Sequence, residues 1–335
     1  MPGTIVQDTM RGIMKAIVQD TYGSPDALEL RDIDEPEIKD DEVLVRVRAA
    51  AVHPGDLFFM EGVPYVFRIG FGLRGPRRKV PGFDVAGVVE AVGSKVQELR
   101  PGDEVFGNGK GTCAEYTAAP EGELAPKPSG LTFEQAAAVP TSAVAALRGI
   151  RDAGKVQPGQ KVLINGASGG VGTYAVQIAK ALGAEVTGVC STGNVDLVRS
   201  IGADHVIDYT RENFIQGEPR YDLILDNVAN HPLSDLRRAL TPEGTLLPNS
   251  GSGGGRWFGP LGRVALAFVS SPFIRKQGRP FVATVKTKDL VDLTKLIEAG
   301  KLAPVIDRTY PLSETPEAMR HVSLGHARGK VVIIV

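Results

Sequence analysis

The sequence predicts an α/β protein in which a doubly wound parallel sheet stands beside a β-rich domain. Three observations predict this class: a complete strand–turn–helix–strand unit at residues 161–192, alternating β and α patterns after it, and strand patterns throughout the first third. Alternating elements of this length imply a parallel sheet with right-handed crossovers. The chain has 335 residues, which is enough for two domains.

The first third is expected to be rich in strands. Strand patterns cover residues 14–20, 28–32, 42–52, 85–92 and 104–107, and Val43, Val45 and Val47 show the alternation of a half-buried strand. Residues 132–149 are helical in character and are expected to connect this part to the central unit.

The central unit carries the strongest signal for a function. An apolar strand at 161–165 is followed by a glycine-rich turn at 166–172, a helix ended by Gly183, and a second strand at 185–190. A glycine turn between a strand and a helix brings backbone N–H groups to a pyrophosphate, which the helix dipole also favours. We therefore expect a dinucleotide to be bound by five residues of the turn, namely Ala167, Ser168, Gly169, Gly170 and Val171.

The alternation continues beyond this unit. Helices are predicted at 195–201, 231–240 and 289–299, and a turn at 241–244. Strands are predicted at 205–208, 221–226, 245–248, 281–285, 305–309 and 331–335. The last strands are expected to return to the first domain. Asn227, Ser250 and Gly251 follow strands on the ligand side and are predicted to contact the cofactor.

Composition excludes several classes of function. The formal net charge is −1, which gives no field for nucleic acid or an anionic membrane. No apolar run approaches the ~20 residues that span a bilayer. Two cysteines form no disulfide framework, which fits a reducing, cytoplasmic compartment. Residues 1–13 lack the apolar region of a targeting signal and are expected to be a disordered extension.

The end of the second strand favours NADP(H) over NAD(H). An acidic residue ~20 positions after the first motif glycine takes the ribose hydroxyl of NAD, and residues 189–193 contain none. Ser191 and Thr192 offer hydroxyl donors, and Tyr209 stands beside Arg211 after the third strand. The alternative is that Ser191 and Thr192 only cap the helix at 195.

Several stretches together resemble the medium-chain dehydrogenase/reductase superfamily, in its zinc-free quinone oxidoreductase-like branch. They are residues 80–89 (VPGFDVAGVV), 101–106 (PGDEVF), 167–172, 202–209 (GADHVIDY) and 329–332 (GKVV). The resemblance covers nearly all of the chain from Met14 to Val335. It implies a GroES-like catalytic domain at 1–137 and 287–335, a Rossmann domain at 138–286, an active site between them, and a homodimer.

The resemblance also implies further contacts with the cofactor. Thr141 lies where relatives approach the nicotinamide, and Arg328 is placed to reach back to the cofactor, although a surface role is equally open. Relatives often carry Lys or Arg where this chain has Gly193, so the NADP prediction depends more on Ser191 and Tyr209.

No metal site is predicted. Zinc-dependent relatives place Cys near residues 52–56 and His-Glu after the glycine at 82, where this chain has His53, Asp56, Phe83 and Asp84. Catalytic zinc needs three side-chain ligands, and phenylalanine is not one. The predicted catalytic residues are His53, Asp56 and Tyr65, with His53 as proton donor. The alternatives are that His53 braces its loop and that Asp56 only caps a helix.

The sequence therefore predicts an NADPH-dependent reductase of a quinone or an α,β-unsaturated carbonyl compound. Two alternatives stay open, a zinc-free alcohol or ketone oxidoreductase and an NADPH-binding sensor or scaffold with little catalysis. The basic run formed by Arg74, Arg77, Arg78 and Lys79 is either a solvated loop or a gate for anionic substrates. The sequence does not name the substrate.

Overall fold

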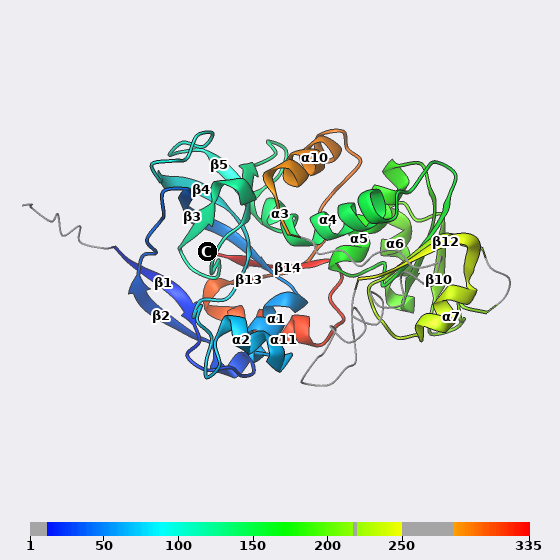
Figure 1. Ribbon diagram of the computed structural model, residues 1–335, viewed down its shortest axis with the longest axis horizontal. Coiled ribbons are helices and arrows are strands. Elements are labelled where there is room, and N and C mark those ends of the chain that lie inside the picture. Colours follow the sequence, from blue (N-terminus) through cyan, green and yellow to red (C-terminus); the bar gives the residue numbers. More distant parts are fainter. Residues whose placement is uncertain (1–11, 217–219, 250–283) are drawn as a thin grey trace, which may run out of the picture.

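Two large sheets form the body of the protein (Figure 1). The computed structural model describes residues 12–216, 220–249 and 284–335. One sheet has five parallel strands in the order β10-β9-β8-β11-β12, and the other has the order β13-β14-β3-β4-β5-β7, with β6 paired to β3. The predicted α/β class with a doubly wound parallel sheet is confirmed.

The parallel sheet agrees closely with the sequence prediction. Its strands are β8 (Lys161–Asn165), β9 (Glu185–Cys190), β10 (His205–Asp208), β11 (Tyr221–Asp226) and β12 (Leu240–Pro248), and its helices include α5 (Gly170–Ala181), α6 (Val195–Ser200) and α7 (Leu233–Arg238). Val162, Leu163 and Ile164 of β8 are fully buried, as a central parallel strand requires.

The second sheet is built around β3, the longest strand of the described part. β3 pairs with β4 along one edge, and with β6 and then β14 along the other. Its strands are β3 (Glu42–Val52), β4 (Asp84–Val92), β5 (Glu104–Asn108), β6 (Tyr116–Pro120), β7 (Leu124–Pro126), β13 (Ile306–Pro311) and β14 (Lys330–Ile334), and β1 (Ile13–Val18) and β2 (Glu29–Asp34) form a separate pair.

Short helices surround this sheet. They are α1 (Pro54–Glu61), α2 (Arg68–Phe71), α11 (Thr315–Ser323) and 3-10 turns at Pro25–Ala27, Tyr65–Phe67, Glu121–Glu123 and Leu312–Glu314. The elements α2, α11, β6 and β7 were not predicted, and α1 was expected only as the helix that Asp56 would cap. β7 has three residues, fewer than the alternating pattern of a strand needs.

The connection between the sheets differs from the prediction. The single helix expected at 132–149 is two helices, α3 (Phe133–Ala137) and α4 (Pro140–Leu147), followed by a π-helical turn at Arg148–Ala153. Pro140 explains the break, because proline has no N–H to continue the hydrogen bonds of the preceding helix and suits the first position of a new one.

One further prediction is corrected, and another lies mostly outside the described residues. The turn expected at 241–244 lies within β12 at a break in its register, because Tyr221 of β11 pairs with Leu240 and Leu223 pairs with Thr245. Proline is tolerated at such an irregularity, which accounts for Pro242. Of the strand expected at 281–285, only Thr284 and Val285 lie among the described residues, and they precede α10 (Thr287–Glu298) without forming a strand.

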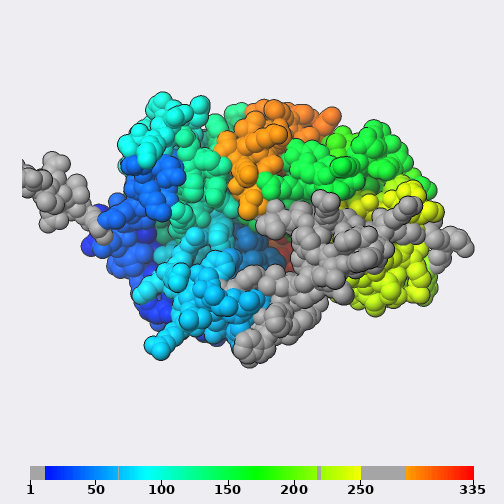
Figure 2. All heavy atoms as spheres, in the orientation of Figure 1, coloured from blue at the N-terminus to red at the C-terminus, as the bar shows by residue number. Residues whose placement is uncertain are grey.

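The chain returns from the parallel sheet to the β3 sheet at its end. Figure 2 shows the residues of α10, in orange, lying across the junction between the two parts. The Thr287 hydroxyl donates to the Leu124 carbonyl oxygen at 2.7 Å, and Arg148 pairs with Asp289 at 2.7 Å. β13 and β14 then enter the β3 sheet, and the predicted domain boundaries remain a prediction.

A buried ion pair joins the two parts internally. Lys330 at the start of β14 is 1% exposed and its Nζ lies 3.0 Å from Oδ2 of Asp84, which is fully buried at the start of β4. The ammonium also donates to Ser142 Oγ at 3.2 Å, and the Thr141 N–H donates to Asp84 Oδ1 at 3.0 Å. Strands of one sheet and a helix from the connection therefore meet at one charge pair.

Removing one member of this pair is expected to be costly. Lys330→Met leaves the Asp84 carboxylate buried without its counter-charge, which should lower the free energy of unfolding by about 3–5 kcal/mol. Urea titration measures the change. The double variant Asp84→Asn/Lys330→Met removes both charges and should recover most of the loss. A single variant within about 1 kcal/mol of the parent would show that the pair is dispensable.

Candidate active site

The glycine turn after β8 is shaped to accept an anion. Gly166 has φ of +79°, a conformation that favours glycine, and a Cβ at Gly172 would lie 2.0 Å from the Gly166 carbonyl oxygen. Both glycines therefore permit the close approach of helix and strand. The turn is thus fixed by backbone geometry before any side chain contributes.

The N–H groups of this turn divide into two sets. Ala167 donates its N–H to the Val189 carbonyl oxygen at 3.0 Å, so it shapes the turn and offers no donor to a phosphate. Ser168, Gly170 and Val171 have N–H groups with no acceptor in the described part of the chain, and no side chain caps α5. Together with the positive end of the helix dipole, these groups fit a pyrophosphate.

A cluster of polar side chains lies at the ends of β9 and β10, where the adenosine ribose of the cofactor was predicted to bind. Neither Ser191 nor Thr192 makes a side-chain capping bond, which rules out the capping alternative. The Thr192 hydroxyl instead donates to Asp208 Oδ2 at 2.6 Å, and Ser191 Oγ accepts from Asn194 at 3.2 Å. Tyr209 is 51% exposed beside them.

Asp208 is a carboxylate that the sequence motif did not reveal, because it comes from the third strand. Hydrogen bonds from Thr192 and Thr210 hold the pKa of Asp208 below its usual range, so it is ionised at neutral pH. The Arg211 guanidinium lies 3.5 Å from it. Thr192 is therefore not a free donor, which corrects its predicted role.

Arg328 reaches this polar group from the other end of the chain. A Cβ built on Gly193 would lie 3.4 Å from Arg328 Nη2. The Gly329 N–H donates to the Ser168 carbonyl oxygen at 2.9 Å, which fixes the segment against the nucleotide turn. The guanidinium thus stands where a basic side chain at position 193 would stand.

An amide cluster closes the carboxyl edge of the parallel sheet. Asn227 donates to the Asn165 carbonyl oxygen at 3.2 Å and accepts from Asn249 at 2.8 Å. Asn165 donates to the fully buried Asp226 at 2.8 Å. Asn227 is therefore held in place beside the turn. Ser250 and Gly251, also predicted to bind the cofactor, lie outside the described residues.

Thr141 connects the nucleotide turn to the β3 sheet. Its hydroxyl donates to Asp84 Oδ1 at 2.5 Å, which leaves the oxygen lone pairs for a donor on a ligand. A Cβ on Gly170 would lie 3.3 Å from Lys330 Cδ, so the buried lysine side chain packs directly against the glycine turn. Asp84 and Lys330 were not predicted, because only the fold brings them together.

His53 and Asp56 form the capping box of α1. The Gly55 N–H donates to His53 Nδ1 at 3.0 Å, and the His53 N–H donates to Asp56 Oδ2 at 2.8 Å. Because Nδ1 accepts, the neutral ring carries its proton on Nε2, and this buried atom has no partner among the described residues. The ring stacks on Phe83 with centroids 6.2 Å apart.

Tyr65, the third predicted catalytic residue, does not contact His53 or Asp56. Its ring lies under the Arg68 guanidinium, 4.6 Å from the ring centroid. Neither Tyr65 nor His53 lines the adjoining cavity, but His53 stacks on Phe83, which does. That cavity has a volume of about 310 Å³ and is lined in part by Asp56, Phe59, Arg78 and Phe83. Asp56 and Phe83 thus connect the capping box to this cavity.

The described residues contain no group of three or more His, Cys, Asp or Glu side chains arranged to hold a metal ion. The helices of this part also lack the combination of length and apolar character needed to cross a bilayer. Burial raises the pKa of the Cys113 thiol, and raises that of Cys190 to about 11, so neither cysteine is a ready nucleophile.

Comparison with known proteins gives matches to both halves of the chain. The alcohol dehydrogenase GroES-like domain family matches residues 39–148, and the zinc-binding dehydrogenase family matches residues 201–333. These matches confirm the predicted GroES-like domain.

Individual relatives cover almost the whole chain. A 2-methylene-furan-3-one reductase of Solanum lycopersicum is 35% identical over 96% of this chain and 79% of its own. An NADPH-dependent alkenal/one oxidoreductase of Arabidopsis thaliana, named as chloroplastic, is 36% identical with the same coverage. The solved quinone oxidoreductase of Coxiella burnetii superposes with a TM-score of 0.84 at 30% identity, over 97% of this chain and 100% of that chain.

The buried Asp56 carboxyl generates a prediction about pH. Asp56 is 1% exposed and burial raises its pKa, so ionising it costs more in the folded than in the unfolded state. Stability should therefore fall as pH rises from about 4 through the raised pKa of Asp56. Asp56→Asn keeps an acceptor for the His53 N–H and should remove this part of the pH dependence, as measured by urea unfolding between pH 4 and 8.

Asp103→Asn is the matched control, because Asp103 also accepts a backbone N–H three residues earlier but is exposed. It should leave the pH profile of stability unchanged. If Asp56→Asn follows the parent profile as closely as this control does, the buried carboxyl is not titrating as described.

Proposed function

We propose that this protein reduces quinones or α,β-unsaturated carbonyl compounds with NADPH and without zinc. The chain belongs to the medium-chain dehydrogenase/reductase superfamily, in its quinone oxidoreductase-like branch, and is therefore an NAD(P)H oxidoreductase. The observation that carries the proposal is the contact between an anion-binding turn and the Asp84–Lys330 pair, beside a donor at His53. The relatives named for alkenal/one and quinone reduction support the same acceptors.

The residues divide the work of the reaction between them. When bound, NADPH supplies a hydride equivalent. Ser168, Gly170 and Val171 hold its pyrophosphate with their N–H groups, and Asn227 and Thr141 orient the remainder. An enone gains this hydride at its β-carbon and one proton at its α-carbon, and a quinone gains a hydride and a proton to give the hydroquinone.

His53 is the proposed hydrogen-bond donor to the acceptor's carbonyl oxygen. Its Nε2–H is buried and without a partner among the described residues, and leaving a buried donor unpaired costs about 1–3 kcal/mol. A carbonyl oxygen at this position would satisfy the donor and withdraw electrons from the conjugated system. His53 can also pass a proton to the enolate that forms on the acceptor.

The preference for NADPH has support from charge. Arg328 Nη2 stands at Gly193, and Arg211 lies beside Asp208, so two guanidinium groups outnumber the one carboxylate there. A 2′-phosphate would add three acceptor oxygens for these cations. Thr192 and Thr210 keep Asp208 ionised, so the neighbouring guanidinium groups of Arg211 and Arg328 are what offset its charge.

Zinc independence is proposed from the set of donors. The matching family is described as a zinc-binding dehydrogenase, but His53 Nδ1 is occupied by the Gly55 N–H and Phe83 provides no ligand. A carbonyl compound activated by its own conjugation needs only a hydrogen bond, which fits a quinone or enone better than a simple ketone. We also propose a homodimer in the cytoplasm, with a small molecule as its only substrate.

The reaction class is tested by NADPH oxidation with a panel of quinones, enones, aldehydes and ketones. Quinones or enones should be reduced fastest, with equal rates before and after dialysis against a chelator. Faster turnover of ketones would favour the alcohol dehydrogenase type of reaction. Tight NADPH binding without turnover of any class would favour a sensor, and one firmly held zinc per chain would contradict zinc independence.

The cofactor preference is tested at Arg328. Arg328→Gln should raise the KM for NADPH by about tenfold, since a charge-assisted hydrogen bond to phosphate is lost, while the KM for NADH stays unchanged. Arg238→Gln is a suitable control, because Arg238 ends α7 at the opposite edge of the sheet. Equal changes for both cofactors would remove Arg328 from 2′-phosphate recognition, and a lower KM for NADH in the parent would contradict the preference.

The role of His53 is tested by two substitutions. His53→Ala loses both the cap and the donor, so it should lower kcat at least tenfold and cost about 1 kcal/mol of stability. His53→Ser restores a capping oxygen but cannot reach the acceptor as the imidazole does. We expect His53→Ser to recover stability and not kcat. Recovery of kcat by serine would show that His53 acts only as a helix cap.

A further inference from the structure

A basic segment borders the cavity beside the candidate active site. Residues 68–79 contain five cationic side chains and no acidic one, namely Arg68, Arg74, Arg77, Arg78 and Lys79. The segment begins with α2 and continues as a loop toward β4. A cluster of one sign in a chain whose net charge is −1 calls for a local explanation.

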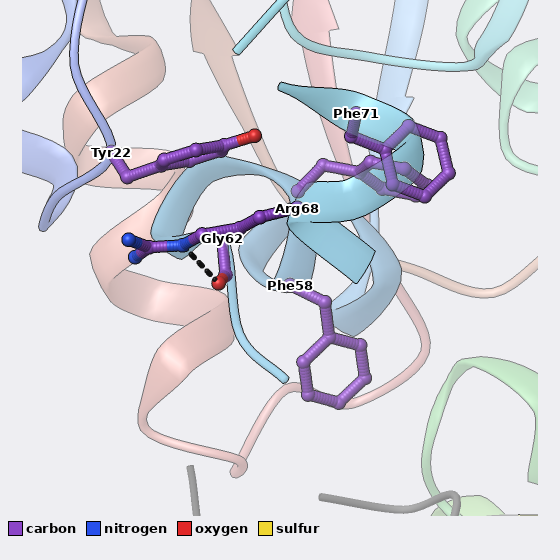
Figure 3. A pocket seen from close by; sticks show the side chains of 6 residues that line it. Tyr22, Phe58, Gly62, Arg68 and Phe71 are labelled. Carbon is purple, nitrogen blue, oxygen red and sulfur yellow. Dashed lines mark hydrogen bonds between the residues drawn. The ribbon is translucent and has the colours of Figure 1, made fainter. Parts of the chain in front are cut away.

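Structural contacts account for part of this cluster. Arg68 donates to the Gly62 carbonyl oxygen at 2.8 Å and stacks over Tyr22 at 4.5 Å, as Figure 3 shows. Lys79 pairs with Asp20 at 2.8 Å. These two cations therefore hold the segment against β1 and α1.

Arg77 and Arg78 are different, because both line the cavity of about 310 Å³. Within the described part of the chain, the Arg77 guanidinium donates to the Gly70 carbonyl oxygen, at 3.3 Å, and to no other group. Arg78 lies over the Phe83 ring, 5.3 Å from its centroid, and makes no hydrogen bond or ion pair with the described residues. The cavity thus has two cations on its wall, and no carboxylate of residues 12–216, 220–249 or 284–335 binds either of them.

The carboxyls near Arg78 do not neutralise its charge by direct contact. Partial desolvation lowers the pKa of Arg78, whereas the more distant carboxyls of Glu123 and Asp56 raise it. Burial raises the pKa of both these carboxyls, which weakens them as counter-ions. Arginine stays protonated at neutral pH, and Arg78 stands solvent-exposed at the cavity wall with no carboxylate of the described residues in hydrogen-bond or ion-pair contact.

The cavity also suits a conjugated molecule. Phe59 and Phe83 lie on its wall, with ring centroids 4.9 Å apart. Phe83 precedes Asp84, whose carboxylate binds Lys330 under the nucleotide turn. Phe83 therefore stands between Asp84 and the Arg78 guanidinium, which lies over its ring at 5.3 Å.

We propose that the acceptors of this enzyme carry an anionic group, a carboxylate or sulfonate, which Arg78 binds together with Arg77 while the conjugated part lies against Phe59 and Phe83. This inference rests on the proposed function and names the substrate class of the same site. The guanidinium fork matches a carboxylate in two parallel hydrogen bonds. The reaction balance is unchanged, because the anionic group takes no part in it.

The test compares two acceptors that differ only in charge, the para-carboxylate of benzylideneacetone and its methyl ester. The parent enzyme should have the lower KM for the carboxylate. Arg78→Gln should raise this KM by about tenfold or more and leave the KM for the ester unchanged. Arg78→Lys should recover part of the loss, and added salt should raise the KM for the carboxylate alone.

Arg74→Gln is the matched control, because Arg74 belongs to the same segment but does not line the cavity. It should change neither KM. A parent enzyme that prefers the ester, or an Arg78→Gln variant that affects both acceptors equally, would overturn the proposal while leaving enone reduction standing.

Direct binding separates this proposal from the reaction itself. Calorimetric titration of the carboxylate into the protein should give a Kd that Arg78→Gln weakens by about tenfold and Arg74→Gln does not. If no acceptor is reduced but this difference is found, the reaction is wrong and the anion site is right. If acceptors are reduced but Arg78→Gln binds the carboxylate as the parent does, the anion site is wrong.

Discussion

The ion pair between Lys330 and Asp84 is the constraint on which the arrangement of the site depends. Both side chains are almost completely buried, and an isolated charge in either place would be prohibitively costly. The pair can form only when β14 returns beside β3 and when β4 begins beside α4. The same lysine supports Gly170 of the nucleotide turn. The pair of Lys330 and Asp84 therefore holds β4 and β14 together and also positions the nucleotide turn relative to the acceptor cavity.

His53 shows how one side chain serves both stability and chemistry. Nδ1 accepts from the first turn of α1, which fixes the ring orientation and the position of its proton. Nε2 is then left as a buried donor without a partner among the described residues. Capping is the structural role that the sequence could equally suggest, and here it orients the ring for the proposed reaction instead of competing with it.

The sequence predicted the parallel sheet well because its signals are local. Strand β8, the glycine turn and helix α5 follow one another directly, and each carries its own pattern. The helix at 132–149 was wrong because the effect of Pro140 outweighed helical composition. The contact of Asp208 with Thr192 was beyond prediction, since separate strands bring the two together. Arg328 was expected near the cofactor from the family resemblance, but its position beside Gly193 follows only from the fold.

The central claim is that hydride passes to a conjugated carbon and not to a carbonyl carbon. The most direct test uses NADPH deuterated at both C4 positions with benzylideneacetone, followed by NMR of the product. The account predicts the saturated ketone with one deuterium on the β-carbon. An allylic alcohol with deuterium on the former carbonyl carbon would contradict it, as would the absence of any transfer.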